Sequence, residues 1–408
     1  MPGRLARFLV LIALVGATIA LVYHESIASN FDKSEWEDQL FFTNDQGFTT
    51  VADAFQRSSY WRGLYRPLST NVYYHLARML GEDPVTPRLA ICHVVSIGVF
   101  ALNVILAFWV CRSFWSYTAA LIVALLFCSR VASTETMLYT SQMQTLLPVT
   151  FSLLAIKAYL AALERDYDPG LLGASTVFVF LGLLCKESVV MIPPLCLVFA
   201  LALASSSRRR GLVQIGLAAL PLVSLIPWYL LAHRILLVRY NPWWYYEKAP
   251  MEIAGNSVAY LVSYSNLAVR PFRLQHGTIF LNLYPTIMEA RRSDVLRIGF
   301  GVAIALCGAT IFLARFGRGV WRPSRDLVWT ALGFAIFLAS IAPVAIFKDR
   351  LLMYYGYFGY FGLSVVVVGA AQTVVRWMLA FRNRGLVVEE VRRLHSADAF
   401  GRVSNRSA

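Results

Sequence analysis

The sequence predicts an all-α polytopic membrane protein with about ten transmembrane helices, in a range of about nine to twelve. Hydrophobic residues make up 58% of the 408 residues and charged residues only 15%, whereas soluble domains are about 45–50% apolar and about 25% charged. The net charge is +14, and the basic residues gather between the apolar runs, where they act as topology signals. This pattern excludes a soluble enzyme, a disordered chain and a nucleic-acid-binding module.

Ten apolar runs approach the length of about 20 residues that spans a bilayer. Arg4 and Arg7 precede the apolar stretch Phe8–Val22, and no small-x-small cleavage site follows it, so we expect an uncleaved helix rather than a signal peptide. The aromatic, Ser-rich stretch 257–271 has two interpretations at this point, an interfacial helix or an eleventh span. The runs are Leu5–Tyr23, Leu89–Val110, Trp115–Phe127, Leu146–Leu163, Leu171–Leu184, Val189–Ala204, Leu212–Leu231, Val295–Ala314, Leu327–Phe347 and Tyr355–Ala380.

The basic clusters predict the orientation of these spans. Arginines gather in 208–210, 315–325 and 376–393. With ten spans, all three clusters fall on the side of the N-terminus, and the positive-inside rule makes that side cytoplasmic. An eleventh span at 257–271 would move one cluster outside, which disfavours it. We therefore expect an integral membrane protein with both termini in the cytoplasm.

The domain organisation follows from this topology. Residues 1–381 form one transmembrane domain, and residues 382–408 form a basic, disordered cytoplasmic tail. The outer loop 24–88 carries a short amphipathic helix in 71–79. The outer loop 232–294 carries an aromatic run that is typical of a membrane interface, with a sugar-stacking platform as the alternative.

The first outer loop is rich in acidic residues. Nine of the 23 Asp and Glu residues of the chain fall within 24–88, and they include the adjacent pair Glu37 and Asp38. Two carboxylates just beyond a membrane span can supply a general base, because one stays ionised while the other orients the site. A solvated acidic loop is the alternative interpretation.

Four cations and two further acids lie in the outer segments of the same topology. Ionisable residues at membrane depth are costly and point to function. Cations that hold a phosphate, together with a carboxylate that accepts a proton from a hydroxyl, suit a lipid-phosphate substrate on the outer face. A surface anchor, a structural ion pair and a loop charge in water are the alternatives. The six residues are Arg66, Glu135, Lys186, Glu187, Lys348 and Arg350.

No cofactor is predicted from the sequence. No pair of Cys or His residues has metal-ligand spacing, so no metal site is expected, although a role for a divalent metal stays open. His93 lies within the second span, where a packing or hydrogen-bonding role is the simpler interpretation.

Short motifs, taken in order over residues 20–365, resemble the GT-C superfamily of membrane glycosyltransferases. They look most like the O-mannosyltransferases that carry a tetratricopeptide array, and like their bacterial relatives. The matching residues are Trp36-Glu37-Asp38 with Asn44, Tyr65-Arg66-Pro67-Leu68, His93, Asn103, Thr134-Glu135, Cys185-Lys186-Glu187-Ser188 and Asp349-Arg350.

The resemblance implies a GT-C-like fold and a transferase that uses a polyprenyl-phosphate-linked sugar, with mannose as the first candidate. It implies that Glu37 or Asp38 is the base, and that Arg66, Lys186, Lys348 and Arg350 hold the donor phosphate. Trp36, Asn44, Tyr65, His93, Glu135 and Glu187 would support them. This sequence departs from the family at Glu37, where the family has Asp, in most of the late motif, and in lacking a tetratricopeptide array.

Two other classes of function fit the same topology. A transporter or lipid flippase would share the spans, but such proteins place charges within spans and carry paired repeats. In this sequence Lys157 is the one charge deep within a predicted span, where a long side chain can reach the interface, and no inverted repeat is visible. A non-catalytic subunit of an envelope-assembly complex is the second alternative. For the transferase, the expected partners are the lipid-linked donor, an unknown hydroxyl acceptor and membrane lipids, and no nucleic acid is expected.

Overall fold

The computed structural model describes residues 2–30, 51–56, 65–79, 89–129, 134–204, 216–236, 325–345 and 357–378. All regular elements in these ranges are helical, as the sequence predicts. They are α1 (Pro2–Asn30), α3 (Val51–Gln56), η1 (Pro67–Val72), α4 (Tyr73–Met79), α5 (Leu89–Arg112), α6 (Tyr117–Cys128), α7 (Thr134–Leu138), η3 (Thr140–Gln142), α8 (Met143–Glu164), α9 (Pro169–Leu183), η4 (Glu187–Met191), α10 (Ile192–Ala204), η5 (Leu220–Ser224), α12 (Leu225–Leu236), α16 (Arg325–Ala345) and a last helix, Tyr357–Met378.

Four stretches of the described chain are long and apolar enough to cross a membrane: Leu5–Tyr23, Ala90–Arg112, Thr140–Glu164 and Tyr357–Met378. Shorter apolar helices, among them α6, α9 and α10, pack with them. Together these helices indicate an integral membrane protein. The predicted span Val295–Ala314, the stretch 257–271 and the tail 382–408 lie outside the described residues.

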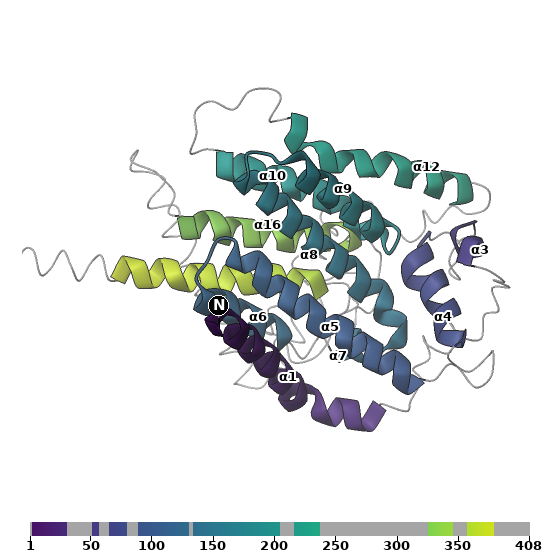
Figure 1. Ribbon diagram of the computed structural model, residues 1–408, viewed down its shortest axis with the longest axis horizontal. Helices are drawn as coiled ribbons and strands as arrows, with labels where there is room; N and C mark the ends of the chain where they lie inside the picture. Colours follow the sequence, from purple (N-terminus) through teal and green to yellow (C-terminus); the bar gives the residue numbers. More distant parts are fainter. Residues whose placement is uncertain are drawn as a thin grey trace, which may run out of the picture.

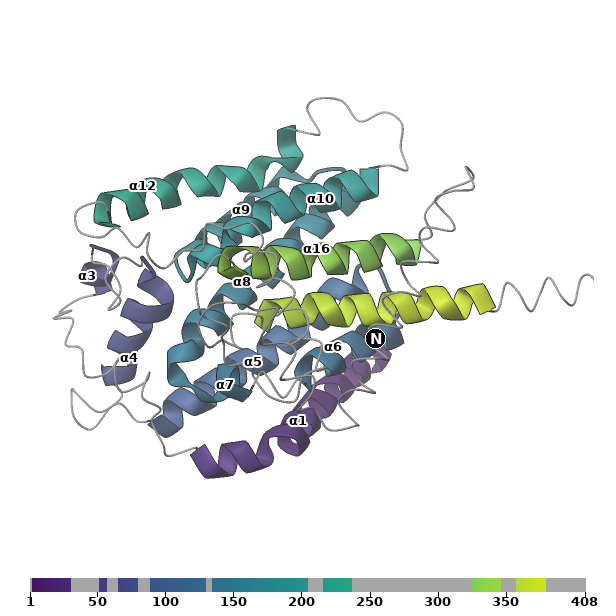
Figure 2. The same ribbon diagram turned by 180° about the vertical axis from the view of Figure 1, so that it is seen from behind.

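Helix α8 lies at the centre of the bundle, between α5 and α9 (Figure 1). The short helices α3 and α4 lie at one end, which we call the α4 end, in both views (Figures 1 and 2). The N-terminus lies away from that end (Figure 1). Near the N-terminus, the Tyr117 hydroxyl donates to the Arg7 carbonyl at 2.8 Å. Helix α4 buries Tyr74 and Ala77 and exposes Leu76 and Met79.

A tight turn reverses the chain between α8 and α9. Asp166 and Tyr167 have positive φ angles of 57° and 67°, and the Tyr167 amide donates to the Ala162 carbonyl at 2.8 Å, which ends α8. Helix α9 then starts at Asp168, whose carboxylate accepts from the Leu171 amide at 3.1 Å. The turn therefore makes α8 and α9 antiparallel neighbours and brings the end of α9 back to the α4 end.

Helix α16 and the last helix cross at a pair of glycines. A Cβ atom on Gly362 would lie 2.6 Å from the Gly333 carbonyl oxygen and 2.7 Å from the Phe337 amide nitrogen. Both neighbours are backbone atoms, which cannot rotate away. Glycine at this crossing therefore lets the two helices approach more closely than any other residue would allow.

We expect Gly362→Ala to destabilise the protein by about 1–3 kcal/mol, because its methyl group must push two backbones apart. Thermal unfolding of the purified protein in detergent measures the effect. Gly98→Ala in α5 is the matched control, because a Cβ there meets nothing within 4 Å. Equal unfolding temperatures for the two variants would show that the helices do not meet at Gly362.

Candidate functional site

The helical structure is interrupted between α9 and α10 at the α4 end, and we call this interruption the break. The Cys185 and Lys186 amides both donate to the Gly182 carbonyl at 2.9 Å, and this closes the last turn of α9. Lys186 then has an extended backbone, with φ −162° and ψ 136°, before the 3₁₀ turn η4 begins at Glu187. In extended backbone, successive side chains point to opposite sides. At this break, Lys186 reaches Thr145 while Glu187 reaches Arg66.

The segment before α4 docks onto this break. The Leu68 amide donates to the Leu184 carbonyl at 3.1 Å, and the Ser69 hydroxyl donates to the Cys185 carbonyl at 2.5 Å. The buried Tyr65 ring packs against Leu184, and its hydroxyl donates to the Phe55 carbonyl at 3.0 Å. Apolar and backbone contacts thus join two segments that lie far apart in the sequence.

Arg66 adds a charged contact to the same junction. Its Nε donates to Glu187 Oε2 at 2.8 Å, and its Nη2 donates to Glu187 Oε1, so the guanidinium holds the carboxylate in two parallel hydrogen bonds. Its Nη1 donates to Gln144 Oε1, at the start of α8, at 2.6 Å. Arg66 is buried, and a buried charge is tolerated only when it is paired in this way.

The neighbours of Glu187 keep its carboxyl ionised. Glu187 lies in the break between helices, outside the four candidate spans. Burial alone would raise the pKa of this carboxyl, but the Arg66 guanidinium and, to a smaller extent, the Lys186 ammonium outweigh burial and lower its pKa to about 2. Glu187 is therefore ionised at neutral pH and is the counter-ion of Arg66.

The side chain of Lys186 extends toward Thr145 on α8. Its Nζ lies 3.3 Å from Thr145 Oγ1, which in turn donates to Gln142 Oε1 at 3.0 Å. Lys186 is buried, with 5% of its surface exposed to solvent. An ammonium group among hydroxyl and amide groups, and largely shielded from water, attracts an anion more strongly than one on an open surface.

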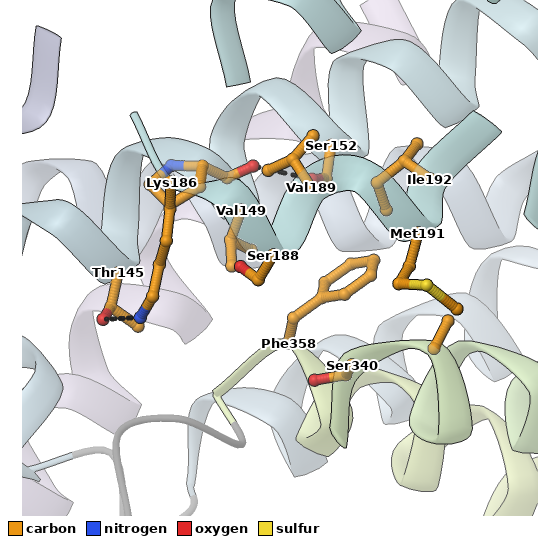
Figure 3. A pocket seen from close by; sticks show the side chains of 12 residues that line it. Thr145, Val149, Ser152, Lys186, Ser188, Val189, Met191, Ile192, Ser340 and Phe358 are labelled. Atoms are coloured by element: carbon orange, nitrogen blue, oxygen red, sulfur yellow. Dashed lines mark hydrogen bonds between the residues drawn. The ribbon is translucent and has the colours of Figure 1, made fainter. Parts of the chain in front are cut away.

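Lys186 lines one side of a partly open pocket. Figure 3 shows Lys186 reaching toward Thr145 at this side, with Met191 and Ile192 at the other and Phe358 between them. Hydroxyl groups come from α8, η4 and α16, and the apolar side chains come from α8, η4, α10, α16 and the last helix. The remaining lining residues are Pro148, Val149, Ser152, Ser188, Val189, Ala339 and Ser340.

This pocket combines a cationic side with an apolar side. An ammonium group next to hydroxyls can hold a phosphate or carboxylate, and the apolar side chains can cover a hydrocarbon chain. The arrangement therefore suits an anionic amphiphile.

Sequence reasoning did not find the polar residues that open α8. Thr140, Ser141, Gln142, Gln144 and Thr145 are all buried, and two of them contact Arg66 and Lys186. The sequence does contain a sign of this site, because a run of polar residues directly precedes the predicted apolar span Leu146–Leu163. A buried polar run is costly unless it is hydrogen-bonded or serves a ligand.

The structure brings together four of the residues singled out in the sequence: Tyr65, Arg66, Lys186 and Glu187. His93 is buried in α5 beside Cys92, which packs against α4. Glu135 lies in α7, whose backbone alone is described at that position. The other residues lie outside the described part of the chain: Trp36, Glu37, Asp38, Asn44, Lys348 and Arg350.

Within the ranges that the structure describes, no cluster of three or more His, Cys, Asp or Glu side chains could hold a metal ion. A scan against models of known protein families finds no match to this chain, and a search of curated proteins finds no similar one. The function is therefore argued from the residues themselves.

Proposed function

We propose that this protein is an integral-membrane glycosyltransferase that moves a sugar, with mannose as the first candidate, from a polyprenyl-phosphate donor to an acceptor hydroxyl. The proposal includes the ten-span, GT-C-like topology, with both termini in the cytoplasm and the site on the outer face of a bacterial inner membrane. One observation carries it: the pocket has the buried Lys186 on one side and apolar side chains on the other.

The two sides of the pocket suit the two chemical parts of such a donor. The phosphate would lie against Lys186 and Thr145, and the first units of the polyprenyl chain would lie against Met191, Ile192 and Phe358. Lys348 and Arg350, from the sequence, would add positive charge near the phosphate. Cations that face the leaving group stabilise the charge that grows on it in the transition state.

In the proposed reaction, the acceptor hydroxyl loses its proton to Glu37 or Asp38 while its oxygen attacks the anomeric carbon of the sugar. The bond between that carbon and the phosphate oxygen breaks with inversion. The electron pair of this bond leaves with the polyprenyl phosphate, next to Lys186. The proton stays on the carboxyl group until it passes to water.

Membrane vesicles that contain the protein, supplied with a radiolabelled mannosyl-phosphoryl-polyprenol, test the proposal. We expect the label to leave the donor and to appear in a new glycosylated product, only where the protein is present. A donor that crosses the bilayer with its sugar attached would instead identify a flippase. A donor that neither reacts nor moves would favour a non-catalytic subunit.

A further inference from the structure

Arg66 and Lys186 are both cations of the candidate site, but they contact different residues around the break between α9 and α10. The Arg66 guanidinium meets Glu187 and Gln144 through all three of its nitrogens. Lys186 meets Thr145 and lines the pocket, whereas Arg66 is not among the lining residues. The two cations therefore make separate contacts.

The contacts of Arg66 fix the direction of Lys186. Lys186 and Glu187 are adjacent in the chain, and their side chains reach different partners, Thr145 and Arg66 respectively. Because both carboxylate oxygens of Glu187 are held, Glu187 is anchored at the junction, and this anchor restricts the backbone next to Lys186. Gln144 and Thr145 are neighbours on α8 and receive Arg66 and Lys186 respectively, which ties both cations to one rigid helix.

We infer that Arg66 is a positioning residue, which holds Lys186 in the pocket by clamping Glu187, and that it is not itself a ligand of the phosphate. This inference rests on the proposed function, in which Lys186 contacts the phosphate of the donor. The clamp needs the planar guanidinium fork, which lysine cannot reproduce although it keeps the charge.

The clamp can be tested without any ligand. In the full-length protein in detergent micelles, an amine-reactive reagent modifies lysines at rates that mass spectrometry measures. We expect Arg66→Lys to raise the rate at Lys186 severalfold, because the released side chain leaves its buried place. Lys157, whose Nζ donates to Ser113 Oγ at 2.6 Å in the other part of α8, is the internal reference, since unfolding would raise both rates together. An unchanged ratio of the two rates would overturn the inference.

Binding of dodecyl phosphate, measured by titration, separates a clamp from a phosphate ligand. We expect Arg66→Lys to weaken binding about tenfold, the lower part of the range for losing a hydrogen bond to a charged group. In a Lys186→Gln background, Arg66→Lys should have no further effect. Equal, additive losses in both backgrounds would instead make Arg66 a ligand in its own right.

The same measurements separate this inference from the proposed function. If the wild-type protein does not bind dodecyl phosphate, but Arg66→Lys still raises the modification rate of Lys186 relative to Lys157, the clamp stands and the proposed donor site is wrong. If dodecyl phosphate binds and Lys186→Gln weakens binding, while Arg66→Lys changes neither rate nor affinity, the donor site stands and the clamp is wrong.

Discussion

Replacing Asp38 by Asn, or Glu37 by Gln, is expected to lower sugar transfer by about 10²–10⁴-fold, the usual contribution of a general base. An amide has nearly the shape of a carboxylate but cannot accept the proton of the acceptor hydroxyl. Both residues lie outside the described part of the chain, so this expectation comes from the sequence. The larger loss identifies the base, and the smaller one identifies the carboxyl group that orients it.

Glu82 and Asp83 form the matched control. They repeat the same pair of residues in the same outer loop, but they lie outside the motifs. Glu82→Gln and Asp83→Asn should keep transfer within about twofold of wild type, as expected for groups without a role in the chemical step. Transfer that survives both Glu37→Gln and Asp38→Asn would refute this assignment of the base.

The second large effect is expected on stability. Arg66→Leu removes one partner of the ion pair and leaves the Glu187 carboxylate alone in the junction. Breaking a fully buried pair costs about 3–5 kcal/mol. The Glu187 side chain is 35% exposed, so water compensates in part, and we expect about 2–3 kcal/mol. Thermal unfolding in detergent micelles measures the loss.

The double variant Arg66→Leu/Glu187→Leu is the control for this prediction. With both charges gone, no carboxylate is left unpaired, and the stability should recover toward wild type. A double variant that is less stable than Arg66→Leu would contradict this account.

The ion pair between Arg66 and Glu187 also predicts that the stability of the protein depends on pH. Because the pKa of Glu187 is lowered to about 2, its stabilisation is complete above the ordinary carboxyl pKa of about 4.3 and is lost as the pH falls toward 2.

The apolar runs of the sequence were enough to predict the long helices of the described part, but not the short helices α3, α7 and η3. The predicted run Leu89–Val110 corresponds to α5, and Trp115–Phe127 corresponds to α6 within two residues at each end. The charged interruption at 185–188 likewise predicted the break between α9 and α10. These features are local, because helix length and breaks depend on neighbours in the chain.

The pairing of Arg66 with Glu187 could not be predicted in the same way. The two residues are 121 positions apart, and no periodicity links them. The sequence therefore presented Arg66 and Lys186 as equivalent cations, whereas the structure gives them different partners. The polar run at the start of α8 was missed for a related reason: a search for apolar spans gives no weight to polar residues that become buried only through tertiary packing.

The most direct test of the donor pocket is photolabelling of the full-length protein with a dodecyl phosphate that carries a diazirine in its alkyl chain. If the phosphate lies at Lys186, the label should attach to the peptides that contain Met191 and Phe358, on the apolar side of the pocket. Excess polyprenyl phosphate and the substitution Lys186→Gln should each remove this label. Labelling that is confined to the exposed face of α1, around Leu9, and is unaffected by Lys186→Gln would contradict the account.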